Sequence, residues 1–399
     1  MKGRVLLLDG ATEPMKAALI VDGRLEDFIS DPWGKPVFPS PGEIFPARVT
    51  RLIPKVGAAF VQLSSFANGY LRDAAGLREG DTVIVQVTGY PEAGKAFPVT
   101  REYLFKSRLL VLTPHAPGAN VSRKIKDTDE RDRLSSTITE LLKRPNPDWG
   151  ELNKRYDGGV IVRSAAMGAA EKALNSELWE LLIEDDRVRT PVDEIKAATG
   201  VHPIGQQPMP VTIALREWTD PIPDKILAAN PLDPGFFLGP VDDPDEWRNV
   251  YGAVLPASIL ELFTGPDLFN RYGVWDEIER LKSPRVDLPS GAWMAVEATR
   301  AMVTVDVNTA GEFGGGASLT ANLEAARELP RQLRLRGLGG QVTVDVAPLK
   351  ISDRKRIEDA LKTSFRRDPV ETTLAGWTPL GNFELQRKRE RRPLRELLP

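Results

Sequence analysis

The pentapeptide Val-Thr-Val-Asp-Val occurs twice in this chain, at residues 303–307 and again at 342–346. β-Branched residues favour strands, and the side chains of a strand alternate between its two faces. The three valines of each copy therefore share one face, and the threonine and the aspartate share the other. Each copy thus places one carboxylate, Asp306 or Asp345, at the same point of a strand that has one apolar face.

The segment between the two copies predicts a helix, because its apolar residues recur close to helical spacing and Gly337 is a suitable residue to end it. Pro330 is expected to interrupt and kink this helix, at a local cost of roughly 3 kcal/mol. A strand, a helix and a strand form a βαβ unit with parallel strands, so Asp306 and Asp345 lie about 5 Å apart if the strands are neighbours. The apolar positions are Leu319, Leu323, Ala326, Leu329 and Leu333.

Two carboxylates at that separation repel, so either one of them binds a proton or a cation lies between them. Ligands with oxygen donors alone favour Mg²⁺ or Mn²⁺. Asn308 shares the face of Asp306 and could orient a carboxylate or an attacking water, and the glycine-rich stretch 311–318 offers backbone amides to an anion. This combination indicates metal-assisted phosphodiester hydrolysis. The alternative is a doubly wound sheet whose strands simply end in acids that cap or meet solvent.

Composition excludes several kinds of chemistry. The chain has no cysteine, which excludes disulfides, thiolate zinc sites and a cysteine nucleophile. Its two histidines lie far apart and outside any metal-ligand pattern, so catalysis should depend on carboxylates and cations. The net charge of −3 gives no hint of nucleic acid, although residues 386–395 are rich in arginine and lysine. The apolar run near the N-terminus is too short for a signal peptide or a membrane span, which predicts a cytoplasmic protein.

Several short strands between residues 44 and 102 predict a small closed barrel. In the strand at residues 57–63 Val61 faces the core and Phe60 faces outward, and Tyr70 lies on the outer face of the next strand. An exposed aromatic pair on a small barrel is typical of a stacking platform for single-stranded nucleic acid, and Lys95 and Arg101 nearby favour that interpretation. The alternative is packing of the two rings against a neighbouring domain.

Elsewhere the pattern mixes strands and helices. Residues 1–30 predict two strands and a turn, followed by a proline-rich linker. Residues 122–144 and 169–190 predict helices, and 158–164 predict a strand between them. From residue 288 to the end, strands and helices alternate.

Taken together, these motifs resemble the ribonuclease E/G family along nearly the whole chain. "GEIFPARVTRLIPKVGAAFVQL" and "GYL" are similar to its S1 domain, and "NVSRKI" and "GGVIVRSA" to its 5′-sensor motifs. "LFTGPDLFNRYGVWDEIE" and "LPSG" resemble the lead-in to its catalytic subdomain. The most specific segments are "TVDVNTA", "ANLEAARELPRQLRLRGLGGQVTVDV" and "GNFELQRKRERRPL".

The resemblance implies an α+β multidomain fold, in which an RNase H-like region is split by inserted domains. Its first part is residues 1–40, followed by an S1 (OB-type) β-barrel at 41–106 and a 5′-sensor domain at 107–207. The second part of the RNase H-like region is residues 208–280, and a DNase I-like α/β catalytic subdomain with a basic C-terminal tail occupies 281–399.

The resemblance also implies a Mg²⁺-dependent endoribonuclease that hydrolyses single-stranded A/U-rich RNA in ribosomal RNA processing and messenger RNA decay. Mn²⁺ is an expected substitute for Mg²⁺. Asp306 and Asp345 match the two metal ligands, and Asn308 matches a catalytic asparagine that forms hydrogen bonds. The remaining matches are Phe60, Tyr70 and Lys95 for RNA binding by the S1 domain, and Val121, Arg163 and Ser164 for sensing a 5′-monophosphate, with Ser164 in place of the usual threonine.

The chain departs from the family pattern in three places. Pro348 stands where a further aspartate is usual after the second metal ligand, and Pro330 stands where a small residue is usual. The cysteines of the family's zinc-link are absent, so no zinc is expected and a homodimer would have to form in another way. These departures leave open an alternative, an S1-domain RNA-binding or ribosome-maturation protein with weak or no catalysis. A nuclease that acts on DNA is a third interpretation.

Overall fold

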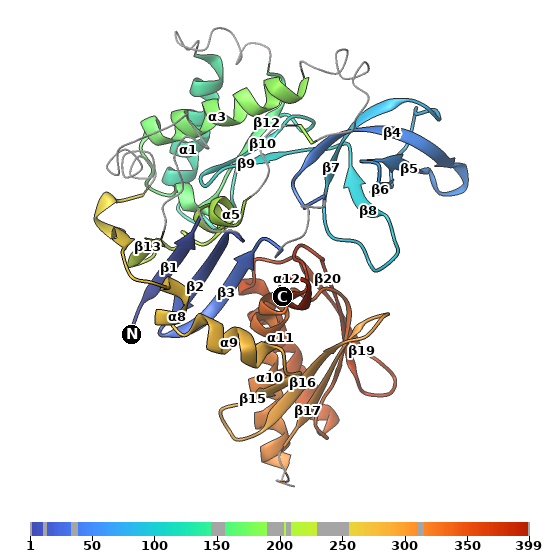
Figure 1. Cartoon of the computed structure of the whole chain (residues 1–399), viewed down its shortest axis with the longest axis vertical. Coiled ribbons are helices and arrows are strands. Elements are labelled where there is room, and N and C mark those ends of the chain that lie inside the picture. The colour runs from blue at the N-terminus through green and yellow to red at the C-terminus, as the bar shows by residue number, and fades with distance from the viewer. Residues whose placement is uncertain are drawn as a thin grey trace. The chain divides into compact units, whose positions relative to one another are not determined.

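The computed structural model describes residues 2–10, 14–32, 39–144, 156–189, 203–204, 209–229, 255–309, 311 and 315–397. The chain has a mixed α+β fold and divides into two compact units (Figure 1). The first unit comprises residues 1–22, 29–31 and 35–266, and the second comprises 23–28, 32–34 and 267–399. None of the helices in the described ranges is long and apolar enough to cross a membrane.

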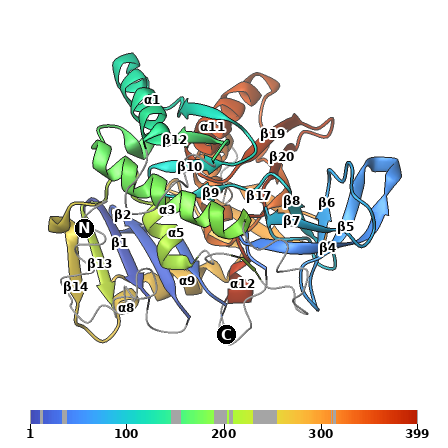
Figure 2. The same cartoon turned by 90° about the horizontal axis from the view of Figure 1, so that it is seen from above.

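The first unit contains a five-stranded sheet with the order β14-β13-β1-β2-β3. Helix α5 (Pro210–Glu217) covers it, because Val211 and Leu215 share a core with Leu6 and Leu8 of the first strand, and Figures 1 and 2 both show α5 beside β1 and β2. The strands are β1 (Arg4–Asp9), β2 (Lys16–Val21), β3 (Arg24–Ser30), β13 (Lys225–Ala229) and β14 (Leu260–Phe263), and residues 23–28 of β3 count with the second unit.

The prediction of two strands before the linker was wrong, because the second of them is a hairpin, β2 and β3. Asp22 and Gly23 adopt positive φ angles of 50° and 81° between the two strands. An Asp-Gly pair in this conformation forms the tight turn that suits the twist of a hairpin. The apolar run therefore reverses at residues 22–23 instead of continuing.

The predicted small barrel is confirmed as a closed barrel of five strands in the order β4-β5-β6-β8-β7. Its interior is filled by the alternate side chains of each strand, among them Val61, Leu71 and Val85. Glycine at position 69 lets strand β6 approach closely, since a Cβ there would lie 2.9 Å from a methyl group of Val61. The strands are β4 (Ile44–Ile53), β5 (Ala58–Gln62), β6 (Asn68–Leu71), β7 (Thr82–Val87) and β8 (Phe97–Thr100).

A four-stranded sheet with the order β11-β12-β10-β9 follows, and two helices pack on it around a shared core. The first of these helices, α1, begins later than residue 122, because the Asp127 side chain accepts a hydrogen bond of 3.0 Å from the amide of Glu130 and caps the helix there. Strand β11 was not predicted. The elements are β9 (Phe105–Lys106), β10 (Leu110–Thr113), β11 (Gly118–Val121), α1 (Thr128–Lys143), β12 (Gly159–Val162) and α3 (Glu171–Arg189).

The second unit is built on a six-stranded sheet with the order β15-β16-β17-β18-β20-β19. Strands β17 and β18 carry the two pentapeptides, run parallel as neighbours and are joined by helix α10, which confirms the predicted βαβ unit. Helices α10 and α11 bury the valine face of this sheet. The main elements are β15 (Arg285–Asp287), β16 (Trp293–Ala298), β17 (Val303–Asn308), α10 (Gly315–Leu335), β18 (Gly340–Asp345), α11 (Arg354–Arg367), β19 (Thr372–Trp377) and β20 (Phe383–Arg387).

Pro330 does not interrupt the helix, in contrast to the prediction, since α10 continues past it to Leu335. The proline removes one amide donor from the helix, which costs roughly 3 kcal/mol. Leu329 and Leu333 on either side are fully buried, and each such side chain contributes about 1.5–3 kcal/mol. Tertiary packing therefore outweighs the local penalty.

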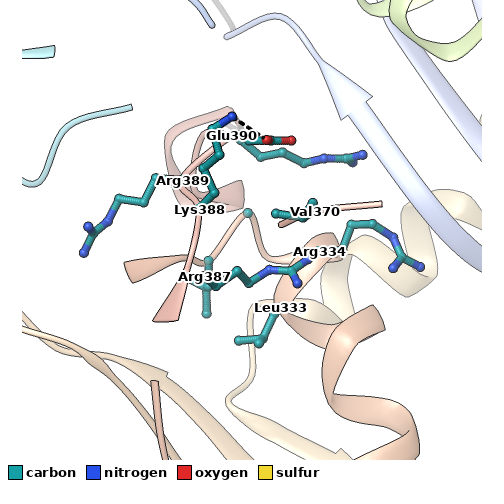
Figure 3. Close-up of a pocket in the computed structure, with 10 residues that line it drawn as sticks. Leu333, Arg334, Val370, Arg387, Lys388, Arg389 and Glu390 are labelled. Carbon is teal, nitrogen blue, oxygen red and sulfur yellow. Dashed lines mark ion pairs between the residues drawn. The ribbon is translucent and has the colours of Figure 1, made fainter. Parts of the chain in front are cut away.

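The arginine-rich C-terminal segment is partly buried in the second unit, since Arg387 is buried and Arg391 is partly exposed, whereas Lys388 and Arg395 are exposed. Arg387 donates to Asp368 at 2.8 Å, and both side chains are only 1% exposed. Arg334 of α10 pairs with Asp368 and with Asp27, and Asp27 also accepts from Arg391 at 2.9 Å. We call these five residues the arginine–aspartate network. Beside it lies a pocket of about 10 Å³, near the lower limit for holding one water molecule, where Figure 3 shows Arg387 and Arg389 pointing in different directions.

The network predicts a large effect on stability when one of its carboxylates is neutralised. Asp368→Asn should lower the free energy of unfolding of the second unit by about 3 kcal/mol, because it leaves buried guanidinium groups without their counter-charge. Hydrogen exchange of the α10 amides in increasing urea measures this effect. The matched control is Asp359→Asn, whose exposed pair with Lys355 should matter little; equal loss of protection in both variants would contradict the prediction.

Candidate metal centre and binding surfaces

The two acidic residues of the repeated pentapeptide lie next to each other. The parallel register of β17 and β18 pairs Asp306 directly with Asp345. Both side chains are exposed, whereas Val305 and Val344 beside them are buried under the helices. The predicted arrangement is therefore confirmed: burial of the valine faces directs both carboxylates to the open face of the sheet.

Asn308 is bound to one of these acids. Its side-chain amide donates a hydrogen bond of 2.8 Å to a carboxylate oxygen of Asp306, two residues earlier on the same face of β17. The bond fixes the rotation of the carboxylate and directs its other oxygen. Asn308 is therefore placed to orient this carboxylate, and its role in catalysis stays a prediction.

Two further glutamates share the open face of the sheet. Glu297 of β16 opposes Thr304, and Glu384 of β20 opposes Thr343, and directly opposed residues of a sheet point to the same side. Within the described ranges, however, no three acidic or histidine side chains come close enough together to hold a metal ion. Among the described residues, Asp306 and Asp345 are therefore the pair of adjacent acids available to a cation on this face.

A pair of carboxylates suits a hard cation that keeps most of its water. Mg²⁺ usually binds through one or two carboxylates together with waters and substrate phosphate oxygens. Two exposed oxygen donors at matched register fit that mode, while they are too few to enclose an ion. Residues 312–314 of the predicted anion-binding stretch 311–318 lie outside the described residues, and the role of the stretch stays a prediction.

The predicted aromatic pair of the barrel lies together on its outer surface. Phe60 and Tyr70 oppose each other across β5 and β6, and their ring centroids are 5.6 Å apart at an angle of 62°. Both rings are partly exposed. The guanidinium group of Arg51 lies 4.7 Å from the centroid of the Phe60 ring, so a cation adjoins the stacking surface.

The two other cations predicted for this surface have partners of their own. Lys95 forms an ion pair of 2.5 Å with Glu92, and its side chain is 67% exposed. Such exposed pairs are weak and leave the lysine available to an anion. Arg101 donates to Asp73 at 3.0 Å and to the carbonyl of Ala75 at 3.1 Å, which gives it a structural role.

Val121 lies at the end of β11, and Arg163 and Ser164 directly follow the neighbouring strand β12. The register pairs Val121 with Val162, the residue before Arg163. The amide of Ser122 donates to the carbonyl of Val162 at 2.8 Å, and amides alternate in direction along a strand. The amide of Val121 therefore points to the open edge of the sheet, since β11 is an edge strand.

The polar groups of Arg163 and Ser164 contact carboxylates that the sequence did not predict. Arg163 forms an ion pair of 2.5 Å with Glu217 and donates to the carbonyl of Ser107 at 2.7 Å, while Ser164 donates to Asp220 at 2.6 Å. Burial opposes ionisation of Glu217, but Arg216 and Arg163 outweigh burial and lower the pKa of its carboxyl.

Known proteins resemble this chain over most of its length. The profile of the Ribonuclease E/G family matches residues 105–390. Ribonuclease G of Escherichia coli (strain K12) is 31% identical over 389 residues, which cover 90% of this chain and 74% of the relative. Ribonuclease G of Haemophilus influenzae is 28% identical, with the same coverage. Ribonuclease E of Escherichia coli (strain K12) is 27% identical over 97% of this chain and 37% of its own length.

The aromatic pair gives a test of the barrel surface. Phe60→Ala combined with Tyr70→Ala should weaken binding of a short single-stranded RNA by at least about tenfold, because each stacked base contributes about 1–3 kcal/mol. Fluorescence anisotropy with labelled RNA measures the affinity. Phe66→Ala removes an aromatic ring that is 64% exposed on the same barrel and serves as the control. A loss no larger than that of the control would show that the pair does not stack on bases.

Proposed function

The chain belongs to the ribonuclease E/G family and is an endoribonuclease of RNA processing, and we propose that it hydrolyses single-stranded A/U-rich RNA with the help of Mg²⁺. Mn²⁺ would be able to replace Mg²⁺, and no zinc takes part. Ribosomal RNA processing and messenger RNA decay are the proposed settings.

The observation that carries this proposal is the register of Asp306 and Asp345, with Asn308 bonded to the first of them. These two carboxylates would hold the ion, and Asn308 would keep the Asp306 carboxylate turned toward it. The bound ion would activate a water molecule and neutralise charge on the scissile phosphate. The acids stay on rigid strands, so no conformational search is needed to bring them together.

Binding of the single strand is proposed for the barrel. Phe60 and Tyr70 would stack on bases, Arg51 would add a cation beside the Phe60 ring, and Lys95 would exchange Glu92 for a backbone phosphate. Stacking on a ring tolerates any base, which suits an enzyme with loose sequence preference.

A 5′-terminal phosphate of the RNA is proposed to bind at Val121, Arg163 and Ser164, which we call the 5′-end position. They would offer an edge amide, a guanidinium fork and a hydroxyl group, a set of donors that matches a phosphate group. The net charge at this position depends on Glu217, which pairs with Arg163, and on Asp220, which accepts a hydrogen bond from Ser164.

The architecture is proposed to follow the family. The five-stranded sheet would be the RNase H-like region, formed by residues 1–40 and 208–280. The barrel would be the S1 domain, the four-stranded sheet the 5′-sensor domain, and residues 281–399 the DNase I-like catalytic subdomain. A cytoplasmic location and a homodimer without a zinc-link are further proposals.

A second candidate function is RNA binding with weak or absent catalysis. It is favoured by one observation: the described residues supply no third acidic or histidine ligand near the pair. Position 348, where the resemblance to the family leads us to expect an acid, is a proline. Under this alternative the barrel surface would bind RNA while Mg²⁺ brought no cleavage.

Removing one ligand separates these candidates. Asp306→Asn should reduce Mg²⁺-dependent cleavage of a labelled A/U-rich RNA by at least about 100-fold, because it removes charge that the bound cation needs. Its RNA affinity should stay unchanged. The control is Asp287→Asn, an exposed acid of the same sheet that pairs with Arg285. Wild-type cleavage that survives EDTA would refute the metal site, and wild-type binding without any cleavage would favour the second candidate.

The hydrogen bond of Asn308 makes a separate prediction. Asn308→Ala should raise the Mg²⁺ concentration for half-maximal cleavage by roughly 10-fold or more, because groups that orient a metal ligand typically change metal affinity by that factor. A Mg²⁺ titration of the cleavage rate measures it. Thr304→Ala, on the same face of β17, should leave the titration unchanged. If Asn308→Ala lowered the maximal rate without shifting the midpoint, the residue would act on the substrate instead.

A further inference from the structure

Two carboxylates from a single short segment engage the cationic and hydroxyl groups of the proposed 5′-end position. Glu217 ends helix α5 and pairs with Arg163 at 2.5 Å, and Asp220, three residues later, accepts from Ser164 at 2.6 Å. The two acids thus contact the two side chains that would bind a terminal phosphate. We call residues 217–220 the acidic turn.

The acidic turn is fixed by its middle residues. Trp218 and Thr219 are buried, with exposed fractions of 4% and 0%. The hydroxyl group of Thr219 donates to the carbonyl of Leu215 at 2.7 Å and accepts from Arg108 at 2.9 Å. Glu217 and Asp220 are therefore presented from an anchored backbone, and withdrawing them would require these contacts to break.

Both oxygens of the Glu217 carboxylate have cationic partners. One accepts from Arg216 at 2.7 Å and the other pairs with Arg163. The side chains of Arg163 and Glu217 are about three-quarters buried, at 24% and 26% exposed, so this pair is screened less than a surface pair. A second hydrogen-bonding nitrogen of Arg163 is used by the carbonyl of Ser107.

We propose that Glu217 and Asp220 act as a built-in substitute for a terminal phosphate and make this enzyme largely indifferent to the 5′ end of its RNA. An entering phosphate would have to displace Glu217 from Arg163 and then lie beside two carboxylates of its own sign. The guanidinium group of Arg163, whose geometry suits a phosphate, is already bound to Glu217 and to the carbonyl of Ser107. This inference rests on the proposed role of Val121, Arg163 and Ser164 in binding a 5′-phosphate. It adds that the acidic turn controls whether that phosphate can bind.

The inference predicts in which direction the preference for a 5′-phosphate changes when the acidic turn is altered. Neutralising the acidic turn removes both the competitor and the repulsion, so it should create a preference for a 5′-phosphate that the natural chain lacks. Arg163 would carry that preference. Removing Arg163 as well should abolish it again, which a merely structural role of the turn would not do.

The test compares two short RNAs of one sequence, with a 5′-monophosphate or a 5′-hydroxyl group, by fluorescence anisotropy in EDTA. The full-length protein should bind both within about twofold, and Glu217→Gln with Asp220→Asn should favour the phosphorylated RNA by about tenfold, as expected for a charge-assisted hydrogen bond. Adding Arg163→Ala should return the ratio to about one. Glu171→Gln is the matched control, because it neutralises an exposed glutamate that pairs with Arg144 at 2.7 Å.

Circular dichroism establishes that each variant is folded, and Asp220→Asn alone, which leaves the Glu217 pair intact, should give a smaller gain in the same direction. A wild-type preference of about tenfold for the phosphorylated RNA, lost in Arg163→Ala, would overturn the inference while supporting the proposed 5′-end position. No gain in any neutralised variant would also overturn it. Cleavage of both RNAs in Mg²⁺ tests the proposed nuclease function separately, since the binding ratio does not depend on catalysis.

Discussion

The second unit depends on the arginine–aspartate network at its centre. Arg334 projects from helix α10 and meets Asp368 and Asp27, and Arg387 at the end of β20 meets the same Asp368. The network therefore links the helix that covers the sheet to a strand of that sheet, through charges that are nearly excluded from water. Buried charges of this kind are tolerated only when each is paired, so the elements that carry them must adopt one arrangement. Strand β18, which carries Asp345, lies beside β20 within that arrangement.

The packing of the second unit also determines where the two carboxylates of the candidate metal centre lie. Because the side chains of a strand alternate, a shift of β18 by one residue would turn its valines outward and Asp345 inward. The buried valines of β17 and β18 therefore set the direction of both carboxylates. The parallel register of the two strands places Asp306 and Asp345 side by side. Asn308 then adds the orientation of one carboxylate. Apolar burial positions the acids, and the acids themselves need no stabilising contact with each other.

The sequence predicted the features that depend on local periodicity. Alternation in the repeated pentapeptide, with a helical pattern between the copies, was sufficient for parallel neighbouring strands and for the pairing of Asp306 with Asp345. The barrel and the outward direction of Phe60 and Tyr70 followed in the same way. The hairpin turn at Asp22-Gly23 was missed although its signal is local.

Contacts between distant segments could not be predicted from one sequence. Glu217 lies 54 residues from Arg163. The contact of Arg51 with the Phe60 ring is local, but it depends on a register shift in β4 that the alternation of side chains does not indicate. The partners of the basic C-terminal run are remote in the sequence, since Asp27 precedes Arg391 by 364 residues. That separation has a consequence for synthesis on the ribosome. Asp27 is synthesised long before its partners Arg334 and Arg391, so the second unit can reach its native form only after Arg391 has been translated.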